Sequence, residues 1–403
     1  MPPINNRWQP SALTPMTMSF VENNREYPAE TGTNYCCLNT LKFNQSTLQF
    51  ASSSSYISSL ELVGDLLLAG SSSELILSFD CSALVTEEAG VTSSLNASFS
   101  SSGKAGAVKS LAALPDQGIL FSAHQDRKIR VWRVRPGDKS PSRIATMPTL
   151  ADRTLGYLSP RRDRVRRHVT STWVCHADAI SALALSVDGT LLYSVSWDRS
   201  MKIWRTSDFK CLESMANAHN DAINTIVASY SGEVYTGSSD GMIKQWKKKD
   251  DNKHALAVTL ESPCSAGVNA LVMSRDESML YSGGSDGVIS SWRIDYGETE
   301  LNSTLTGHVS SVLCLGTATS NLLVSGSADR TIRVWRSGCT NGRFTKVMHT
   351  CVRVLEGHGG PVKCLVVGMA TDEGGADDAT KVVIYTGGLD CDMKVWRVRV
   401  PTT

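Results

Sequence analysis

One pattern of residues recurs six times along this 403-residue chain. Each copy has a Ser or Thr, an Asp four positions later and a Trp six positions after the Asp: Ser122/Asp126/Trp132, Ser194/Asp198/Trp204, Thr236/Asp240/Trp246, Ser282/Asp286/Trp292, Ser325/Asp329/Trp335 and Thr386/Asp390/Trp396. A repeat of about 40 to 45 residues that holds several short strands cannot bury its own faces, so neighbouring repeats must stack. Radial stacking of such units gives a propeller.

A seventh, degenerate copy precedes the six clear ones. Residues Tyr56–Phe79 have the same rhythm, but Ala69, Ser73 and Phe79 stand where the other copies have Ser or Thr, Asp and Trp. The sequence therefore predicts an all-β, seven-bladed propeller over residues 46–400. The last repeat is one strand short of four, and the segment Ser46–Phe50 is predicted to supply its outer strand, which closes the ring without an unpaired edge.

Three segments interrupt or flank the repeats. Residues 1–45 are rich in Pro, Asn, Thr and Ser, which predicts a disordered N-terminal segment. A long basic insertion is expected over residues 133–172, between blades 2 and 3, and an acidic, Gly-rich loop over residues 371–380 in blade 7. Both insertions are expected to be surface loops, where binding residues are often found.

Composition excludes several classes of protein. A net charge of +1 and a pI near 7.5 give no global electrostatic signature of nucleic-acid or membrane binding. The sequence shows neither an apolar run of membrane-spanning length nor a secretory signal, which predicts a cytoplasmic, possibly nuclear, protein. The eleven cysteines lack metal-type spacing, and Cys314, Cys364 and Cys391 fall where a strand would point inward. No metal or cofactor is predicted.

Four repeats add a histidine about twenty residues before the Asp, or thirty-two in the last repeat: His176, His219, His308 and His358. A catalytic Ser-His-Asp set is needed once, beside a cleft, whereas this set recurs and is always joined to a Trp. It is therefore interpreted as a buried relay of hydrogen bonds from Asp to imidazole to hydroxyl to indole.

These motifs resemble those of the WD-repeat propeller family, in which the His, Ser or Thr, Asp and Trp tetrad is structural. The resemblance implies four complete tetrads, and blades 2 and 5 lack the histidine. The residue after each repeat-ending Trp is basic: Arg133, Arg205, Lys247, Arg293, Arg336 and Arg397. The W-D-x-R signature of cullin ligase receptors is therefore absent, and solvated or inter-blade ion pairs are expected instead of an anion-binding ring.

The order of features also resembles a narrower group, the plant jingubang-like WD-repeat proteins. The resemblance rests on RIATMPTL (Arg143–Leu150), VRRH (Val165–His168), LLYSVSWDRSMKIWR (Leu191–Arg205) and KCLESM (Lys210–Met215). It implies a plant regulatory scaffold and not an enzyme.

Family geometry implies that partners bind on the top face, around the central channel. The residues implied there precede the tetrad Asp (Gln125, Trp197, Ser239, Ser285, Ala328 and Leu389) or lie near the start of the inner strand (Tyr56, Ser58, Lys109, Ser181, Asn224, Asn269, Leu313 and Lys363). Trp197 is singled out because exposed aromatics are frequent binding hot spots. Alternatively, it caps a strand end or packs beneath the long insertion.

The basic run in the insertion contains Arg161, Arg162, Arg164, Arg166 and Arg167. It can be a solvated loop, a nuclear import signal or a dock for an acidic protein or phosphate. The function predicted for the whole chain is a non-enzymatic scaffold that binds peptide segments of other proteins, with no small-molecule substrate. Alternatives are a substrate receptor of a cullin-type ubiquitin ligase, or an RNA-binding propeller that uses the basic insertion.

Overall fold

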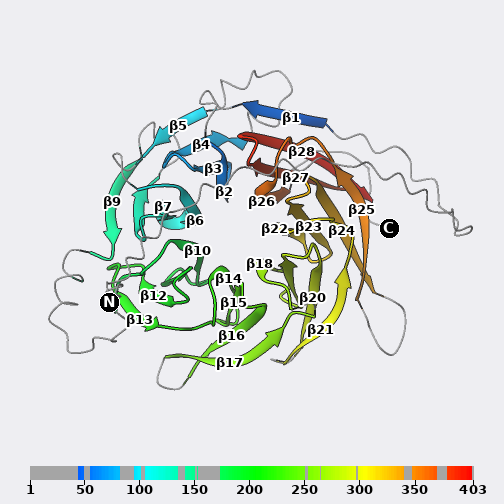
Figure 1. Ribbon diagram of the computed structural model, residues 1–403. Coiled ribbons are helices and arrows are strands. Elements are labelled where there is room, and N and C mark those ends of the chain that lie inside the picture. The colour runs from blue at the N-terminus through cyan, green and yellow to red at the C-terminus, as the bar shows by residue number, and fades with distance from the viewer. Residues whose placement is uncertain are drawn as a thin grey trace, which may run out of the picture. The chain divides into compact units, whose positions relative to one another are not determined.

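Seven antiparallel sheets of four strands each form the computed structural model of this chain (Figure 1). The structure describes residues 44–49, 55–81, 95–100, 105–134, 141–149, 152, 173–249, 253–263, 265–295, 298–339, 347–369 and 379–401. Within these residues no helix has the length and apolar character needed to cross a membrane. The all-β, seven-bladed architecture predicted from the repeats is therefore confirmed.

Each sheet is one blade, and its strands are listed here from the inner to the outer strand. Blades 1 to 3 are β2 (Ile57–Val63), β3 (Leu66–Ser71), β4 (Ile76–Asp80), β5 (Leu95–Phe99); β6 (Val108–Leu114), β7 (Ile119–His124), β8 (Ile129–Arg133), β9 (Ser142–Met147); and β10 (Ile180–Leu185), β11 (Leu191–Ser196), β12 (Met201–Arg205), β13 (Cys211–Met215). A 3₁₀ turn, η2 (Pro115–Gln117), joins β6 to β7.

The remaining blades follow the same order. Blades 4 to 7 are β14 (Ile223–Ala228), β15 (Val234–Ser238), β16 (Met242–Lys248), β17 (His254–Glu261); β18 (Val268–Met273), β19 (Met279–Gly284), β20 (Ile289–Asp295), β21 (Glu298–Leu305); β22 (Val312–Thr319), β23 (Leu322–Ser327), β24 (Ile332–Cys339), β25 (Val347–Leu355); and β26 (Val362–Met369), β27 (Ala379–Gly388), β28 (Asp392–Pro401), β1 (Asn44–Gln49).

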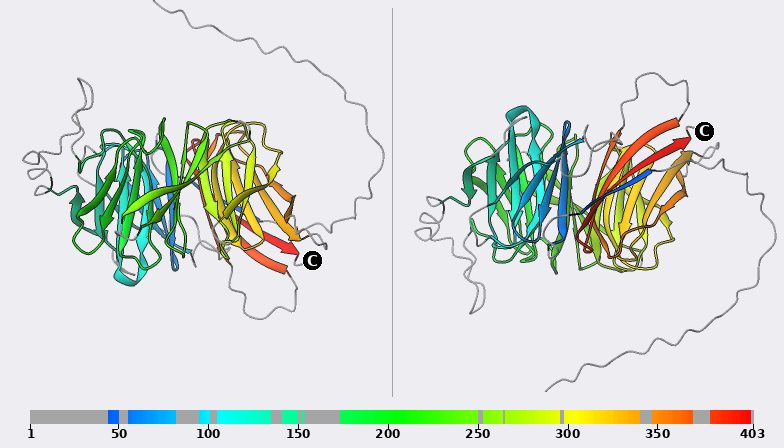
Figure 2. Two further views of the ribbon diagram at one scale, coloured as in Figure 1. Left: turned by 90° about the horizontal axis from the view of Figure 1, so that it is seen from below. Right: turned by 90° about the horizontal axis from the view of Figure 1, so that it is seen from above.

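The inner strands surround the centre of the ring, and the outer strands lie on its rim (Figure 1). Each inner strand contacts the inner strands of both neighbouring blades, including β26 with β2. Viewed edge-on, the strands run from one face of the ring to the other (Figure 2). We call the face that carries the turns between the second and third strands of the blades the tetrad face, because the tetrad Asp residues lie in these turns.

The ring is closed by the two ends of the propeller sequence. β1 pairs antiparallel with β28, with Thr47 opposite Lys394 and Leu48 opposite Met393. The predicted closing strand was placed at Ser46–Phe50, but pairing begins at Asn44, because backbone hydrogen bonds continue along β28 whatever the side-chain pattern. Phe50 and residues 1–43 lie outside the described residues.

Both predicted insertions are shorter than expected. Ser142–Met147, placed in the insertion over 133–172, is the outer strand of blade 2, with Arg143 opposite Trp132. Its first three residues are exposed, so it lacks the apolar alternation of the other strands. Ala379 and Thr380, placed in the loop over 371–380, begin β27. The arginines at 161–167 and residues 371–378 lie outside the described residues.

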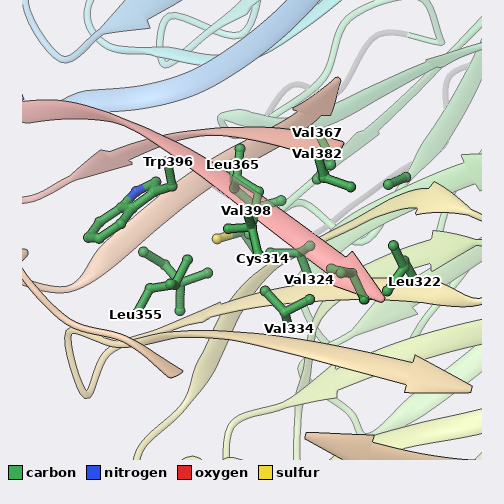
Figure 3. Close-up of a cluster of buried hydrophobic side chains, with 14 of the residues drawn as sticks. Cys314, Leu322, Val324, Val334, Leu355, Leu365, Val367, Val382, Trp396 and Val398 are labelled. Carbon is green, nitrogen blue, oxygen red and sulfur yellow. The ribbon is translucent and has the colours of Figure 1, made fainter. Parts of the chain in front are cut away.

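The core consists of seven hydrophobic clusters, each shared by two neighbouring blades. Figure 3 shows the cluster between blades 6 and 7, in which Trp396 and Leu365 lie beside Cys314 and Leu355. Cys314 and Cys364 are buried as expected. Cys391 is not in a strand, because it occupies the turn after Asp390 with a φ of 66°.

The repeat-ending aromatic residue of every blade packs against the preceding blade. Trp396 lies in the cluster between blades 6 and 7, and Phe79 of the degenerate repeat takes the same place between blades 7 and 1. Burying such a ring removes roughly 150–250 Å² from water, which at about 25 cal/mol per Å² favours folding by about 4–6 kcal/mol before entropy is counted. Packing between blades is therefore the main source of stability.

Removal of β1 is expected to destabilise the ring. A chain that starts at Ser55 leaves the edge of β28 unpaired, whereas a control chain that starts at Lys42 keeps β1. We expect the shorter chain to unfold at a lower temperature and to self-associate, as measured by circular dichroism and gel filtration. Equal melting temperatures and two monomeric chains would contradict the closing role of β1.

Candidate functional site

The sequence-predicted relay of hydrogen bonds runs through blade 6 from the protein interior to the tetrad face. Trp335 Nε1 donates to Ser325 Oγ at 2.8 Å, and His308 Nε2 lies 2.8 Å from the same hydroxyl. His308 Nδ1 lies 2.8 Å from Asp329 Oδ2. A carboxylate can only accept, so Nδ1 carries the imidazole proton and Ser325 donates to Nε2. Every polar group of the relay is thereby satisfied.

Blades 4 and 7 repeat this relay. His219 contacts Thr236 and Asp240, and His358 contacts Thr386 and Asp390; the indoles of Trp246 and Trp396 donate to the Thr hydroxyls. In blade 3, His176 Nε2 and Trp204 Nε1 contact Ser194 Oγ at 2.8 and 2.9 Å. There His176 Nδ1 lies 2.8 Å from Ser200 Oγ and 3.5 Å from Asp198 Oδ2.

The Asp of each relay also fixes the local backbone. Asp329 accepts hydrogen bonds from the backbone amides of Val309 and Thr331. The next residue, Arg330, has a φ of 71°, and Arg127 and Arg199 adopt the same left-handed conformation in their blades. The carboxylate thus holds a tight turn against the chain that enters the blade.

Burial sets the charge states in the relay. It lowers the pKa of all four histidines, and the neighbouring Asp offsets this in part, so each imidazole is neutral near pH 7. Burial would raise the pKa of Asp329, but hydrogen bonds from Thr331 and His308 outweigh it and lower the pKa to about 2. The hydroxyl of each relay is fully buried and accepts the indole N–H, so in the described geometry no substrate can reach it for nucleophilic attack.

Blade 2 replaces the missing histidine in a way that sequence spacing did not predict. His124, two residues after Ser122 on β7, contacts the Ser122 hydroxyl at 2.8 Å, and Trp132 Nε1 donates to it at 2.8 Å. Arg130 forms a bidentate ion pair with Asp126 at 2.7 and 3.0 Å. Burial lowers the pKa of His124 to about 4, and the charge of Arg130 acts in the same direction.

Blade 5 keeps the indole bond, from Trp292 Nε1 to Ser282 Oγ at 2.9 Å. Its Asp286 is exposed and accepts a bond from the amide of Val288. No histidine completes this relay in the described residues.

The predicted binding positions at the start of the inner strands share one backbone feature. The pairing of every inner strand with its neighbour shifts register at the second residue, as a β-bulge does. The bulged residues are Ser58, Lys109, Ser181, Asn224, Asn269, Leu313 and Lys363.

Four of these bulge residues bond to the next blade instead of projecting freely. Ser58 Oγ donates to the carbonyl of Val108, Ser181 Oγ to that of Ile223, and the amides of Asn224 and Asn269 to those of Val268 and Val312. Each acceptor is the first residue of the neighbouring inner strand. These bonds join the blades, and Ser58 is buried.

Lys109, Leu313 and Lys363 break this pattern. Lys363 is exposed, and Lys109 and Leu313 are half-buried. In the part of the chain that the structure describes, neither lysine contacts a carboxylate. These three residues, in blades 2, 6 and 7, are therefore the bulge residues best placed to meet a partner.

The residues before the tetrad Asp lie on the tetrad face. Gln125, Ser239 and Ser285 are exposed, Ala328 is half-buried, and the backbone amide of each bonds to the start of its own blade. Trp197 and Leu389 are 42% and 43% exposed. Lys109 Nζ lies 5.0 Å from the centre of the Trp197 ring. Tyr56 is half-buried.

Three of the basic residues that follow the repeat-ending Trp form ion pairs within their own blades. Arg205 lies 3.2 Å from Asp208, Lys247 lies 2.7 Å from Glu233, and Arg293 lies 3.9 Å from Glu300. The pairs of Arg205 and Arg293 are partly exposed to solvent, which fits the solvated alternative. Among the described residues, no group of His, Cys, Asp or Glu is arranged to hold a metal ion.

Comparison with known proteins gives the following matches. A family model described as "WD domain, G-beta repeat" matches residues 94–133, 167–205, 209–247, 256–293, 299–336 and 349–397. The mouse kinesin-like protein KIF21B is 28% identical over 184 residues, which are 40% of this chain and 11% of that protein.

Two further relatives match larger parts of their own length. The peroxisomal targeting signal 2 receptor of Schizosaccharomyces pombe is 26% identical over 46% of this chain and 58% of that protein. A ribosome biogenesis protein WDR12 homolog from Brugia malayi is 27% identical over 57% of this chain and 52% of that protein. The chain thus spans less than two thirds of each of these relatives.

Loss of a relay carboxylate is expected to destabilise the propeller. Asp329→Ala leaves the His308 imidazole and two backbone amides without their acceptor, at a cost of about 1–3 kcal/mol for each buried group. The control is Asp286→Ala in blade 5, whose exposed carboxylate has no histidine partner among the described residues. We expect urea unfolding to show a clear loss for the first variant and less than about 1 kcal/mol for the second. Equal effects would contradict the role of the relay.

Mild acid is expected to destabilise the fold. An unfolded histidine titrates near about pH 6.5, and the folded tetrad histidines have a lowered pKa. The unfolded chain therefore takes up more protons, so stability falls as the pH decreases below about 6.5. Urea unfolding at about pH 7.5 and about pH 5.5 measures this difference. A free energy of unfolding that is equal or higher at the lower pH would contradict it.

Proposed function

Because the chain belongs to the WD-repeat family, whose propellers typically serve as protein-interaction scaffolds, we propose that it is a non-enzymatic adaptor that binds peptide segments of regulatory partners on its tetrad face. The observation that carries this proposal is Trp197. The Trp residues of the tetrads are buried between blades, whereas Trp197 is 42% exposed in a tight turn. An aromatic side chain held on a rigid turn binds a partner at low entropic cost.

Apolar side chains on the tetrad face support the same role. Leu389 is exposed in the blade 7 turn, and Val309 of blade 6 is 88% exposed where the chain enters its blade. Leu313, half-buried, lies at the start of β22 in the same blade. Exposed aliphatic groups on the same face as an exposed aromatic residue suit a peptide better than a nucleic acid, whose backbone requires mainly cationic contacts.

The biological setting is part of the proposal. The RIATMPTL and LLYSVSWDRSMKIWR segments (Arg143–Leu150 and Leu191–Arg205) resemble plant jingubang-like proteins, which favours plant regulatory signalling in the cytoplasm and nucleus. One relative is, by name, a receptor for a targeting signal, which agrees with recognition of short segments. The cullin-receptor and RNA-binding alternatives stay predictions.

Substitution of Trp197 is expected to remove partners without unfolding the protein. The control is Tyr230→Ala, because Tyr230 is 70% exposed in a turn between first and second strands, on the face opposite the tetrad face. A third variant changes the arginines at 161, 162, 164, 166 and 167 to Ala. After circular dichroism confirms folding, affinity mass spectrometry should show a set of proteins lost with Trp197→Ala and retained with Tyr230→Ala. Loss with the arginine variant alone would contradict binding at the tetrad face.

A further inference from the structure

Two lysines occupy the same bulge position on either side of blade 1. Lys109 is the second residue of β6 in blade 2, and Lys363 is the second residue of β26 in blade 7. Elsewhere this position carries Ser or Asn side chains that bond to the neighbouring blade, or Leu313. Ser, Asn and Leu are uncharged, so the two lysines add positive charge at this position. Among the residues that the structure describes, neither lysine forms a hydrogen bond to the neighbouring blade.

The two ammonium groups influence one another. Burial lowers the pKa of Lys109, and the positive charge of Lys363 lowers it further. Lys109 Nζ also lies over the ring of Trp197, at 5.0 Å from the ring centre. Ser58, the bulge residue of blade 1 between them, is uncharged and buried, and its hydroxyl already donates to the carbonyl of Val108. Neither lysine forms an ion pair in the described residues, and the Glu74 carboxylate of the blade 1 turn is bonded to the amide of Ala105. An anion bound between two like charges relieves their repulsion.

The charges on the rest of the tetrad face are unevenly distributed. Asp178 and Asp221 are exposed just before the inner strands of blades 3 and 4, and Asp286 is exposed in blade 5. Exposed arginines follow the tetrad Asp in blades 2, 3 and 6: Arg127, Arg199 and Arg330. Exposed Arg127 and Arg330 and the exposed Lys363 therefore give blades 2, 6 and 7 more cationic than anionic side chains in this set, with Glu356 exposed at the entry to blade 7, and blades 4 and 5 present negative charge.

An apolar contact adjoins the lysines. The amide of Leu389 bonds to the carbonyl of Pro361, two residues before Lys363, so the exposed Leu389 side chain belongs to the same part of blade 7. A ligand held there meets positive charge and an aliphatic surface together. A nucleic-acid backbone or an inorganic phosphate would use the charge but not the aliphatic surface.

Resting on the proposed function, we propose that the tetrad face selects an acidic peptide segment, in which an Asp or Glu carboxylate binds between Lys109 and Lys363 and an adjoining apolar side chain contacts Leu389. Blades 4 and 5 add specificity, because Asp221 and Asp286 repel a segment that is acidic along its whole length. We therefore expect the bound peptide to be acidic where it lies over blades 7, 1 and 2, and neutral or basic where it lies over blades 4 and 5.

The test is selection from a random peptide library displayed on phage, with the full chain as bait. Selected peptides are then synthesised with a fluorescent label, and their binding is measured by anisotropy. The test variant carries Lys109→Glu and Lys363→Glu. The matched control carries Lys248→Glu and Lys249→Glu, which changes the net charge equally at the end of β16 remote from the tetrad face, where both lysines are exposed. Melting temperatures confirm that both variants fold.

We expect the selected peptides to be enriched in Asp or Glu beside an apolar residue. Their affinity should fall by about tenfold or more in the test variant, and by less than about threefold in the control. Leu389→Asp should weaken the same peptides. Replacement of the peptide carboxylates by amides should reduce binding to the wild type to the level seen with the test variant.

Other outcomes overturn the inference in distinguishable ways. Neutral peptides that depend on Leu389 and Trp197 but not on the lysines would refute acidic selection and leave peptide binding at the tetrad face intact. Peptides insensitive to all these substitutions, or no enrichment at all, would refute both proposals. Displacement of the acidic peptides by polyuridylate at equal charge concentration would show a general polyanion site and refute peptide selectivity.

Discussion

Every blade in this protein depends on its neighbour to bury its apolar faces. The repeat-ending aromatic of each blade lies in a cluster with the preceding blade, and Phe79 does so in the repeat that lacks Trp. Because the clusters lie between blades, the ring must close to bury the last one, and β1 completes the sheet at that point. Stability is thus distributed around the circumference, and the side chains at the channel mouth are free to vary.

Hydrogen bonds fix the positions of the turns on the packed blades. Each is worth about 1 kcal/mol net, less than a buried ring, but an unpaired buried group costs more than the bond gains. The relays of blades 3, 4, 6 and 7 hold the tetrad turns, and the bulge residues of blades 1, 3, 4 and 5 bond across to the next blade. The result is a face whose turns are fixed relative to one another.

Features that recur in every repeat were predicted from the sequence, and features particular to one blade were missed. The number of blades, the closing strand and the relay partners follow from spacing in the chain. β9 was missed because its exposed residues, such as Arg143, carry no apolar alternation. His124 was missed because it reaches Ser122 from the same strand, and spacing along the chain does not reveal side-chain direction. The hydrogen bonds that Ser181 and Asn224 form between blades depend on a β-bulge, and no residue pattern in the sequence predicted that bulge.

Near-symmetry makes the exceptions informative. A contact that recurs in several blades stabilises the ring. The family resemblance implied that four bulge residues contact a partner, but their side chains form hydrogen bonds between blades: Ser58, Ser181, Asn224 and Asn269. A residue that breaks the repeat and makes no bond to the neighbouring blade is not explained in this way. Lys109 and Lys363 place two charges at a position that is uncharged in the other blades, and Lys109 lies over the exposed ring of Trp197. Because two like charges at equivalent positions favour an anion on the tetrad face, this departure from the repeat is the basis of the proposed acidic-peptide site.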